Sequence, residues 1–264
     1  MKTKTNAPDP WQHTRLKTYS GAPFEKFRLM IKLDRQDTTF ILTLDDEENR
    51  WNTTFVRAIS AALDEVEAST GPAALVTTAS HPKFFSNGLD LEWRASSGEH
   101  RGGDRAAFGS EFMALMGRII TLPVPSICAI NGHAFGNGAI LACACDFRFM
   151  RADKGFFCFP EVDLSIPFLP GMIEFVKKAM PYYRFNEMKL SGRRVSGKEL
   201  EQDHVVEKAY DTQESLMEGA LNYAKTFDKK RGIFGEHKKR LHKHIIHTID
   251  NENKSLIESL SLMA

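Results

Sequence analysis

One carboxylate set in an apolar stretch is the residue of this sequence best suited to acid–base chemistry. Glu161 directly follows Pro160 within residues 156–169, a stretch rich in phenylalanine, leucine and proline. Burial among such side chains raises the pKa of a carboxylate toward the range useful for proton transfer. We therefore predict that Glu161 is a catalytic base. If Glu161 instead lies in a surface turn, Asp163 is equally eligible.

Two glycine-marked turns are suited to binding an anion through backbone N–H groups. In residues 84–91, Gly88 can adopt a positive φ that aims the next N–H outward, and Asp90 can bond local backbone groups. In residues 131–138, Gly136 stands where a helix begins after a strand. A helix start leaves N–H groups without partners at the positive end of the helix dipole. The structural alternative is that these glycines only permit tight turns.

The two turns together predict an oxyanion hole. Two N–H groups that meet at one carbonyl oxygen stabilise the negative charge that develops there, by about 2.7–4 kcal/mol for each donor. A base beside such a pair suits the removal of a proton next to a carbonyl group. The favoured chemistry is therefore the deprotonation of a carbonyl compound.

The elements that must position these residues alternate between strands and helices. Helices are predicted after an Asn52 cap, over residues 108–120, and from the second turn to Cys145. This alternation predicts an α/β architecture. Strands are predicted over residues 27–33, 39–44 (after a turn at 34–37), 73–78, 126–130 and 147–150.

Three regions follow from the composition along the chain. Residues 1–25 are polar, basic and proline-containing and predict a flexible arm, residues 26–197 predict the core, and residues 198–264 predict a helical region. Residues 96–105 are rich in glycine, serine and charge, which predicts a mobile loop.

Length and charge narrow the class of protein. The 264 residues fit one large domain or a domain with a helical appendage, and the 42% hydrophobic fraction suffices for a sizeable core. A net charge of +1 argues against a general nucleic-acid binder. No apolar run approaches the ~18–20 residues that span a bilayer, and no signal peptide is expected at the start.

The four cysteines all lie in apolar segments, and their spacing includes no Cys-x-x-Cys pair. The pattern predicts buried free thiols, without disulfides and without a metal site.

Four motifs in order resemble the crotonase (enoyl-CoA hydratase/isomerase) superfamily. They are Phe-Ser-Asn-Gly-Leu-Asp-Leu at 85–91, Asn-Gly-His-Ala-Phe-Gly-Asn-Gly at 131–138, Cys-Asp-Phe-Arg at 145–148 and Pro-Glu-Val-Asp-Leu at 160–164. Residues 188–196 are similar to the family's segment before its C-terminal helices, and the resemblance extends from residue 27 to 250.

The resemblance implies a fold, a ligand and an assembly. The fold is a spiral of ββα units with a C-terminal helical region, which packs homotrimers that are often doubled into hexamers. The ligand is an acyl-CoA thioester, in which coenzyme A is part of the substrate, so no separate cofactor is expected. No nucleic acid, membrane or metal is expected as a partner.

The resemblance also implies roles for individual residues. The oxyanion donors would be the backbone N–H groups of Leu89 and Asn137. Lys239, in a basic stretch, would meet the coenzyme A phosphates. The substrate-binding positions are Ser86, Asn87, Gly88, Asp90, Gly136, Gly138, Ile140, Pro160 and Lys239.

A comparison with the family's hydratases indicates the reaction. Hydratases use two glutamates; the first falls on Ile140, which cannot titrate, and the second falls on Glu161. A single glutamate resembles the Δ3,Δ2-enoyl-CoA isomerases, and the motifs resemble the plant peroxisomal type. The implied reaction, in unsaturated fatty acid β-oxidation, is a shuttle. Glu161 removes an α-proton from a 3-enoyl thioester and returns it at the γ-carbon.

Two alternatives stay open. One is other thioester chemistry with one carboxylate, such as weak hydration or decarboxylation. The other is a non-catalytic acyl-CoA-binding subunit, against which Glu161 and both turns count, because a binder needs no desolvated base. Trp93 and the residues to Arg105 could line the acyl pocket, but the chain length is not determined.

The histidines can have a structural role or a catalytic or metal-binding role. A packed or hydrogen-bonded role is favoured for His133, since the shuttle needs no second base. The basic stretch with His237, His242, His244 and His247 favours a solvated helix face over a metal site.

The compartment is left open. The resemblance implies a peroxisome, whereas the terminal Ser-Leu-Met-Ala is not a Ser-Lys-Leu-type signal. The basic arm is compatible with a mitochondrion, and the cytoplasm is equally compatible.

Overall fold

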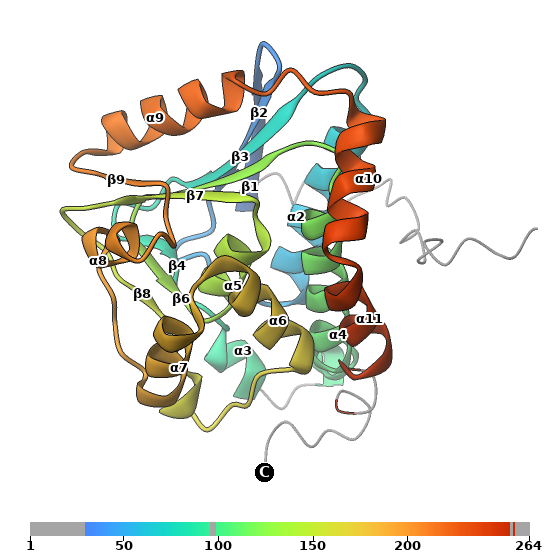
Figure 1. Ribbon diagram of the computed structural model, residues 1–264. Helices are drawn as coiled ribbons and strands as arrows, with labels where there is room; N and C mark the ends of the chain where they lie inside the picture. The colour runs from blue at the N-terminus through green and yellow to red at the C-terminus, as the bar shows by residue number, and fades with distance from the viewer. Residues whose placement is uncertain (1–29, 96–98, 254–255, 257–264) are drawn as a thin grey trace, which may run out of the picture.

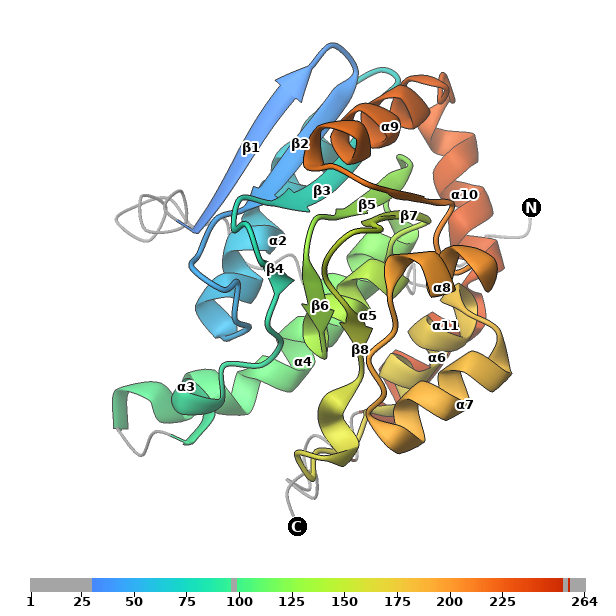
Figure 2. The same ribbon diagram turned by 90° about the vertical axis from the view of Figure 1, so that its left-hand side faces the viewer.

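Two sheets organise the computed structural model, which describes residues 30–95, 99–253 and 256 (Figures 1 and 2). The predicted arm at 1–25 lies outside the described residues. The strands are β1 (Ile31–Gln36), β2 (Thr39–Leu44), β3 (Ala74–Ala79), β4 (Phe84–Ser86), β5 (Ser126–Ile130), β6 (His133–Phe135), β7 (Phe147–Arg151), β8 (Phe157–Cys158) and β9 (Lys208–Tyr210).

Helices follow most of the strands. They are α2 (Thr53–Ala68), α3 (Leu91–Ala95), α4 (Glu99–Thr121), α5 (Asn137–Ala144), the 3₁₀ turn η1 (Pro160–Val162), α6 (Pro170–Ala179), α7 (Tyr182–Ser191), α8 (Gly197–Gln202), α9 (Gln213–Lys225), α10 (Arg231–Leu241) and α11 (Lys243–Asn251). None of the helices in the described part of the chain is long and apolar enough to cross a membrane.

The chain passes three times from a large sheet to a small one. The large sheet has the order β1-β2-β3-β5-β7-β9, in which the β1–β2 pair is antiparallel and the other pairs are parallel. The small sheet has the order β4-β6-β8 and is parallel. Each small strand follows a large one in sequence: β4 follows β3, β6 follows β5, and β8 follows β7. This repeated strand–strand–helix path is the predicted α/β spiral.

The large sheet lies between two layers of helix (Figure 1). On one face, α9 packs over β3, β5 and β7 and closes a small apolar cluster that includes Val76, Ile127 and Leu216. The main core lies on the other face, where α2, α4, α5 and α6 bury their apolar sides. Both faces of the central strands are therefore covered, which explains their continuous apolar sequences.

The predicted start of α2 is confirmed in detail. Asn52 Oδ1 accepts a hydrogen bond from the N–H of Phe55 at 2.9 Å, which satisfies one of the free donors of the first helical turn. Phe55 and Trp51 meet edge to face at 5.2 Å, so the cap and the first buried aromatic ring hold the same end of the helix.

Three predicted boundaries are wrong. The turn predicted at 34–37 is shorter, because β1 continues to Gln36 and pairs with Thr39, so that Asp37 (φ 53°) and Thr38 reverse the chain. The loop predicted at 96–105 is helical from Glu99, where α4 begins; residues 96–98 are outside the described part. The charged pattern after residue 198 is not helical throughout, because Lys208–Tyr210 joins β7 as a strand.

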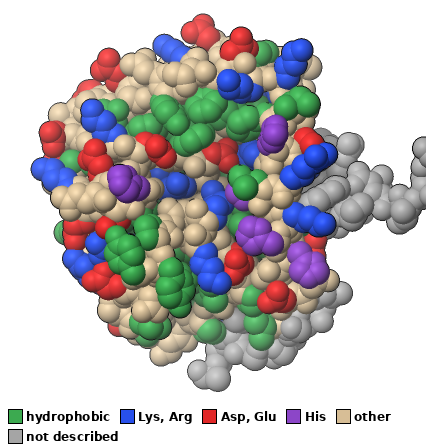
Figure 3. All heavy atoms as spheres, viewed as in Figure 1, with side chains coloured by type: hydrophobic (Ala, Val, Ile, Leu, Met, Phe, Trp, Pro, Cys, Tyr) green, Lys and Arg blue, Asp and Glu red, His purple; other side chains and the backbone are tan. Residues whose placement is uncertain are grey.

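Acidic and basic side chains are interspersed over the face shown in Figure 3. This distribution agrees with the net charge of +1.

Candidate active site

The small sheet brings the three predicted site segments to one edge. Gly88 comes shortly after β4, Gly136 directly after β6, and Glu161 shortly after β8. The three strands are parallel and adjacent, so their carboxyl ends meet at the same edge, where α/β proteins commonly bind ligands. Segments separated by up to 73 positions in the sequence therefore become neighbours (Figure 2).

Glu161 lies at this edge as a buried carboxylate. It is the middle residue of η1, and it is 8% exposed. Asp163, in contrast, is exposed, and its carboxylate lies against Gly192. Burial raises the pKa of Glu161 to about 7, opposed by the nearby ammonium group of Lys189. Of the two acids that the sequence leaves open, burial therefore favours Glu161, whose role as the base stays a prediction.

The glycine of each turn permits close contact between the turns and Glu161. Gly136 has a φ of 50°, and a β-carbon added there would lie 2.9 Å from Glu161 Oε1 and 3.8 Å from the α-carbon of Gly88. Gly88 has a φ of 79°, and a β-carbon there would lie 3.1 Å from the carbonyl oxygen of Phe135. Both positions need glycine for conformation and for space. The two turns and the carboxylate thus form one site.

The N–H of Leu89 points away from Trp51, whose backbone pairs with the first turn. The carbonyl of Gly88 accepts a hydrogen bond from Trp51 N at 2.8 Å. The N–H and C=O of a trans peptide point in opposite directions, so the N–H of Leu89 points away from Trp51. This direction leaves the predicted donor available.

The N–H of Asn137 is directed out of the start of α5. The carbonyl of Gly136 accepts from Ile140 N at 3.0 Å inside the helix, so the N–H of the same peptide points the opposite way. Here the helix dipole adds partial positive charge. The positions of Leu89 and Asn137 agree with their predicted role as oxyanion donors, which itself stays a prediction.

Ser86 braces the first turn from behind. Its hydroxyl donates to the carbonyl of Asn49 at 2.7 Å and accepts from Trp51 Nε1 at 3.0 Å, and the side chain is fully buried. The α-carbon of Gly138 packs directly against it. The hydroxyl of Ser86 is therefore bonded inside the protein and positions the turn, and the predicted contact of Ser86 with the substrate stays a prediction.

The polar side chains of the first turn are also bonded within the protein. Asn87 Nδ2 donates to Glu48 at 2.7 Å, and Asp90 Oδ1 accepts from the N–H of Trp93 at 2.9 Å at the start of α3. The predicted local bonding of Asp90 is confirmed. For Asn87 and Asp90, these side-chain bonds stabilise the turn, and their predicted contact with the substrate stays a prediction.

Three further positions predicted to bind the substrate lie in three different elements. Pro160 begins η1, next to Glu161. Ile140 lies in α5, 1% exposed in the main core, one helical turn after Gly136. Lys239 lies in α10, whose neighbour Lys238 bonds Asp146, beyond the carboxyl end of α5 and so away from the turns. Within this chain, Lys239 is not brought to the site.

Lys189 is a site residue that the sequence reasoning missed. Its Nζ lies 4.0 Å from Glu161 Oε2 and 3.6 Å from the centre of the Phe168 ring. Burial lowers the pKa of Lys189, and the charge of Glu161 opposes that effect. Lys189 belongs to α7, 28 positions after Glu161, so no local pattern links the two residues.

His133 is a structural histidine, as favoured from the sequence. Its Nδ1 accepts a hydrogen bond from the N–H of Phe156 at 3.1 Å, and its ring packs against those of Phe84, Phe135 and Phe156. Burial, followed by the charge of Lys83, lowers its pKa. The ring therefore ties β6 to the segment before β8.

In the described part of the chain, the other side chains of types that can bind a metal do not form a ligand set. Across residues 30–95, 99–253 and 256, no three His, Cys, Asp or Glu side chains are grouped to hold a metal ion. His242 is buried, and burial followed by the charge of Lys178 lowers its pKa to about 4. The prediction that the cysteines are buried and free is confirmed for all four.

Known proteins similar in sequence carry related names. A family profile described as "Enoyl-CoA hydratase/isomerase" matches residues 34–259. The chain is 30% identical over 230 residues to "Enoyl-CoA delta isomerase 1, peroxisomal" of Arabidopsis thaliana, covering 83% of this chain and 93% of that protein. It is 38% identical to a carnitinyl-CoA dehydratase of Salmonella enteritidis over 149 residues, covering 56% of this chain and 55% of that protein.

Solved structures have the same fold. An enoyl-CoA hydratase/isomerase family protein from Pseudomonas syringae superposes with a TM-score of 0.80 at 22% identity, covering 88% of this chain and 98% of that one. An enoyl-CoA hydratase from Mycobacterium ulcerans superposes with a TM-score of 0.77 at 20% identity, covering 87% and 98%. The predicted fold class is confirmed. From the sequence profile and the fold together, this chain belongs to the enoyl-CoA hydratase/isomerase family, the crotonase superfamily.

Proposed function

We propose that this protein is a Δ3,Δ2-enoyl-CoA isomerase, which moves the double bond of a 3-enoyl-CoA to the 2-position. The observation that carries the proposal is the make-up of the site. Glu161 is a buried carboxylate against the second turn, which packs on the first, whereas every side chain of α5, which follows the second turn, is uncharged. The similarity to Arabidopsis proteins named enoyl-CoA delta isomerases supports it.

The proposed reaction uses one base twice. The thioester oxygen accepts hydrogen bonds from the N–H groups of Leu89 and Asn137, which makes the α-proton acidic. Glu161 removes that proton, and the charge of the dienolate rests on the two donors. The same carboxyl group then returns the proton at the γ-carbon, so no proton is gained or lost overall. Coenzyme A is part of the substrate, and no further cofactor takes part.

The pKa of Glu161 suits this shuttle. A group that takes a proton in one step and returns it in the next works best with a pKa near the working pH. Burial brings the pKa of Glu161 to about 7. Ile140 contributes an apolar side chain where a second acid would hold water, and exclusion of water protects the dienolate.

The first prediction is that Glu161→Gln abolishes isomerisation but retains thioester binding. Purified protein is mixed with a 3-enoyl-CoA, and the ultraviolet absorbance of the conjugated product is followed. We expect kcat to fall by about a thousandfold, in the range of a lost general base. The affinity for a saturated acyl-CoA, measured by calorimetry, is expected to stay within a few-fold of the original, because the base acts in the transition state.

Asp163→Asn is the matched control, since Asp163 is an exposed acid two positions away. It is expected to keep normal turnover. Normal turnover in Glu161→Gln would contradict the assignment of the base, and loss only in Asp163→Asn would move the base to Asp163.

Hydration is the second candidate, because the chain is similar to a carnitinyl-CoA dehydratase. The same preparation is given a 2-enoyl-CoA, and loss of absorbance is followed. Efficient hydration without isomerisation would replace the proposed function, whereas acyl-CoA binding with neither reaction would favour a binding subunit. We also propose that the protein forms a homotrimer or a hexamer, and light scattering measures the molar mass of the assembly.

A further inference from the structure

A lysine that the proposed shuttle does not use lies against the proposed base. Lys189 Nζ is 4.0 Å from Glu161 Oε2, and the side chain of Lys189 is 18% exposed. The ammonium also lies over the Phe168 ring at 3.6 Å, a contact in which the face of the ring attracts a cation. Two contacts therefore hold the ammonium group beside the carboxylate.

The two oxygens of Glu161 have different surroundings. Oε1 lies against Gly136, on the side of the two turns. Oε2 is buried and has no hydrogen-bond partner among the residues that the structure describes. The opposite charge that lies near it is the ammonium of Lys189. A buried carboxylate oxygen without such a charge would favour the protonated form.

The other titratable groups packed around η1 do not supply this charge. Cys158, at the end of β8, is a thiol whose pKa is raised to about 11 by burial and, to a smaller extent, by the charge of Glu161. Asp163, at the other end of η1, carries a negative charge and lies against Gly192. Arg194 has its guanidinium over the Phe135 ring at 5.3 Å. Lys189 of α7 is the cation whose charge acts on Glu161 directly.

We propose that Lys189 is a positioning residue for the base: it holds Oε2 of Glu161, favours the ionised form of the carboxylate that takes the proton, and leaves Oε1 facing the turns to carry that proton. This inference rests on the proposed function for the role of Oε1. The contact between the two side chains stands without it.

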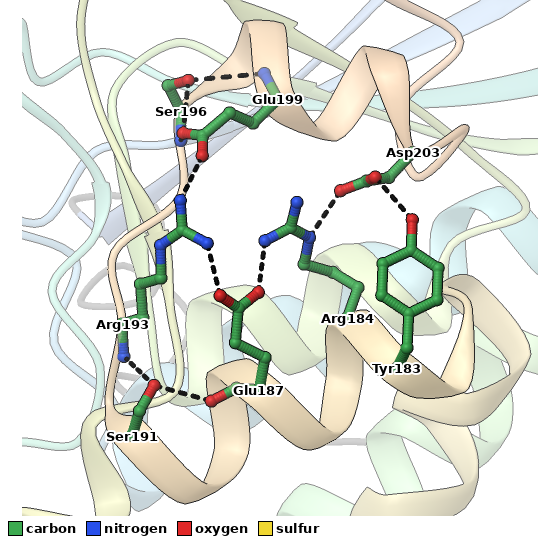
Figure 4. A network of polar contacts seen from close by, with 8 residues as sticks. All are labelled: Tyr183, Arg184, Glu187, Ser191, Arg193, Ser196, Glu199 and Asp203. Carbon is green, nitrogen blue, oxygen red and sulfur yellow. Dashed lines mark hydrogen bonds and ion pairs between the residues drawn. The ribbon is translucent and has the colours of Figure 1, made fainter.

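The helix that carries Lys189 is fixed to its neighbour by charged pairs (Figure 4). Arg184 and Arg193 both bond Glu187 on α7. Arg193 also bonds Glu199 of α8 at 2.5 Å, and Arg184 bonds Asp203 at 2.5 Å. These pairs link both ends of α7 to α8, and a fixed helix is what a positioning residue requires.

The second prediction compares Lys189→Met with Lys189→Arg. Methionine keeps the length of the side chain and removes its charge, whereas arginine keeps the charge. In Lys189→Met, the pKa of Glu161 is expected to rise by at least about one, because an opposite charge at this distance lowers a carboxyl pKa by about that amount or more. The pKa that governs the acidic side of the kcat/KM profile rises by the same amount, so kcat/KM at pH 6 falls about tenfold. Lys189→Arg is expected to restore the wild-type profile in large part.

Carbon-13 NMR of protein labelled at the glutamate carboxyl groups measures the pKa of Glu161 without substrate. The resonance is assigned by its absence in Glu161→Gln. Lys198→Met is the control, because Lys198 is an exposed lysine on α8, and its loss is expected to leave both the resonance and the profile unchanged.

The outcomes separate the two proposals. An unchanged pKa of Glu161 in Lys189→Met, or an equal loss of kcat/KM at every pH, would overturn the positioning role. A shifted resonance without any isomerisation in the wild type would support the contact and reject the proposed function instead.

Discussion

At the scale of single residues, Glu161 combines chemistry with a cost in stability. Its pKa is about 7 in the folded protein, against an ordinary value of 4.5, and burial is the main cause. The folded state therefore binds the proton more tightly than the unfolded state. The stability associated with the protonated group is present at low pH and is lost as the pH rises from about 4.5 to about 7.

The third prediction is that Glu161→Gln stabilises the protein, and more so at high pH. Glutamine is neutral at every pH and avoids the burial of a charge. The gain in the free energy of unfolding is expected to be roughly 2 kcal/mol larger at pH 8 than at pH 5. Urea unfolding of both proteins at each pH measures the difference. An equal effect of the substitution at the two pH values would contradict the raised pKa.

At the scale of elements, the three strands of the small sheet act as a scaffold for three short turns. β4, β6 and β8 deliver Gly88, Gly136 and Glu161 to one edge, and the buried Ser86 hydroxyl holds the first turn in place. The contact is close enough that a methyl group added at Gly136 would lie 2.9 Å from Oε1 of the proposed base Glu161. Catalytic geometry of this kind tolerates little displacement.

The fourth prediction concerns Gly136→Ala. The added β-carbon would lie 2.9 Å from Glu161 Oε1, and the φ of 50° is strained for alanine. We expect kcat/KM to fall at least about a hundredfold, as for a lost oxyanion donor. The free energy of unfolding is expected to fall by about 1–3 kcal/mol.

Gly232→Ala is the matched control, because a β-carbon there meets no atom within 4 Å. Its activity and its thermal midpoint are expected to stay close to those of the wild type. Retained activity in Gly136→Ala would show that the second turn does not contact the reacting group.

At the scale of the whole molecule, a buried ion pair ties the C-terminal helices to the core. Lys238 Nζ on α10 bonds Asp146 Oδ2 at 2.7 Å and the carbonyl of Ile119 in α4 at 3.1 Å. Asp146 also accepts from the N–H of Ser126 at the start of β5. One lysine thus joins α10, α4 and the entry of two central strands.

The fifth prediction is that Lys238→Met destabilises the whole fold. Removal of the lysine leaves the mostly buried carboxylate of Asp146 without its ion-pair partner, at a cost of roughly 3 kcal/mol. Arg240→Met, on the exposed side of the same helix, is the control and is expected to change the free energy of unfolding by less than about 0.5 kcal/mol. Chemical unfolding gives both values, and equal stabilities would contradict a structural role of the pair.

Local sequence determined the parts of the fold that depend on neighbours along the chain. Asn52 caps α2 because its side chain reaches an N–H three positions on, and β5 and β7 are strands because their apolar runs are short and bounded by turn residues. The order of the motifs was enough to predict the family and the fold. The start of α4 was missed because glycine and charge in its first turns resemble a loop.

Tertiary structure decided which residues share the site. Glu161 and Asp163 are equivalent by type and differ only in burial, which depends on how η1 packs against α7. Lys189 reaches Glu161 from another helix, and β9 is a strand only because β7 offers it free backbone groups. Local propensity acts over a few residues, whereas side-chain contacts across elements are set by packing of the whole chain. The sequence by itself therefore determined the chemistry available, and the fold decided which groups meet.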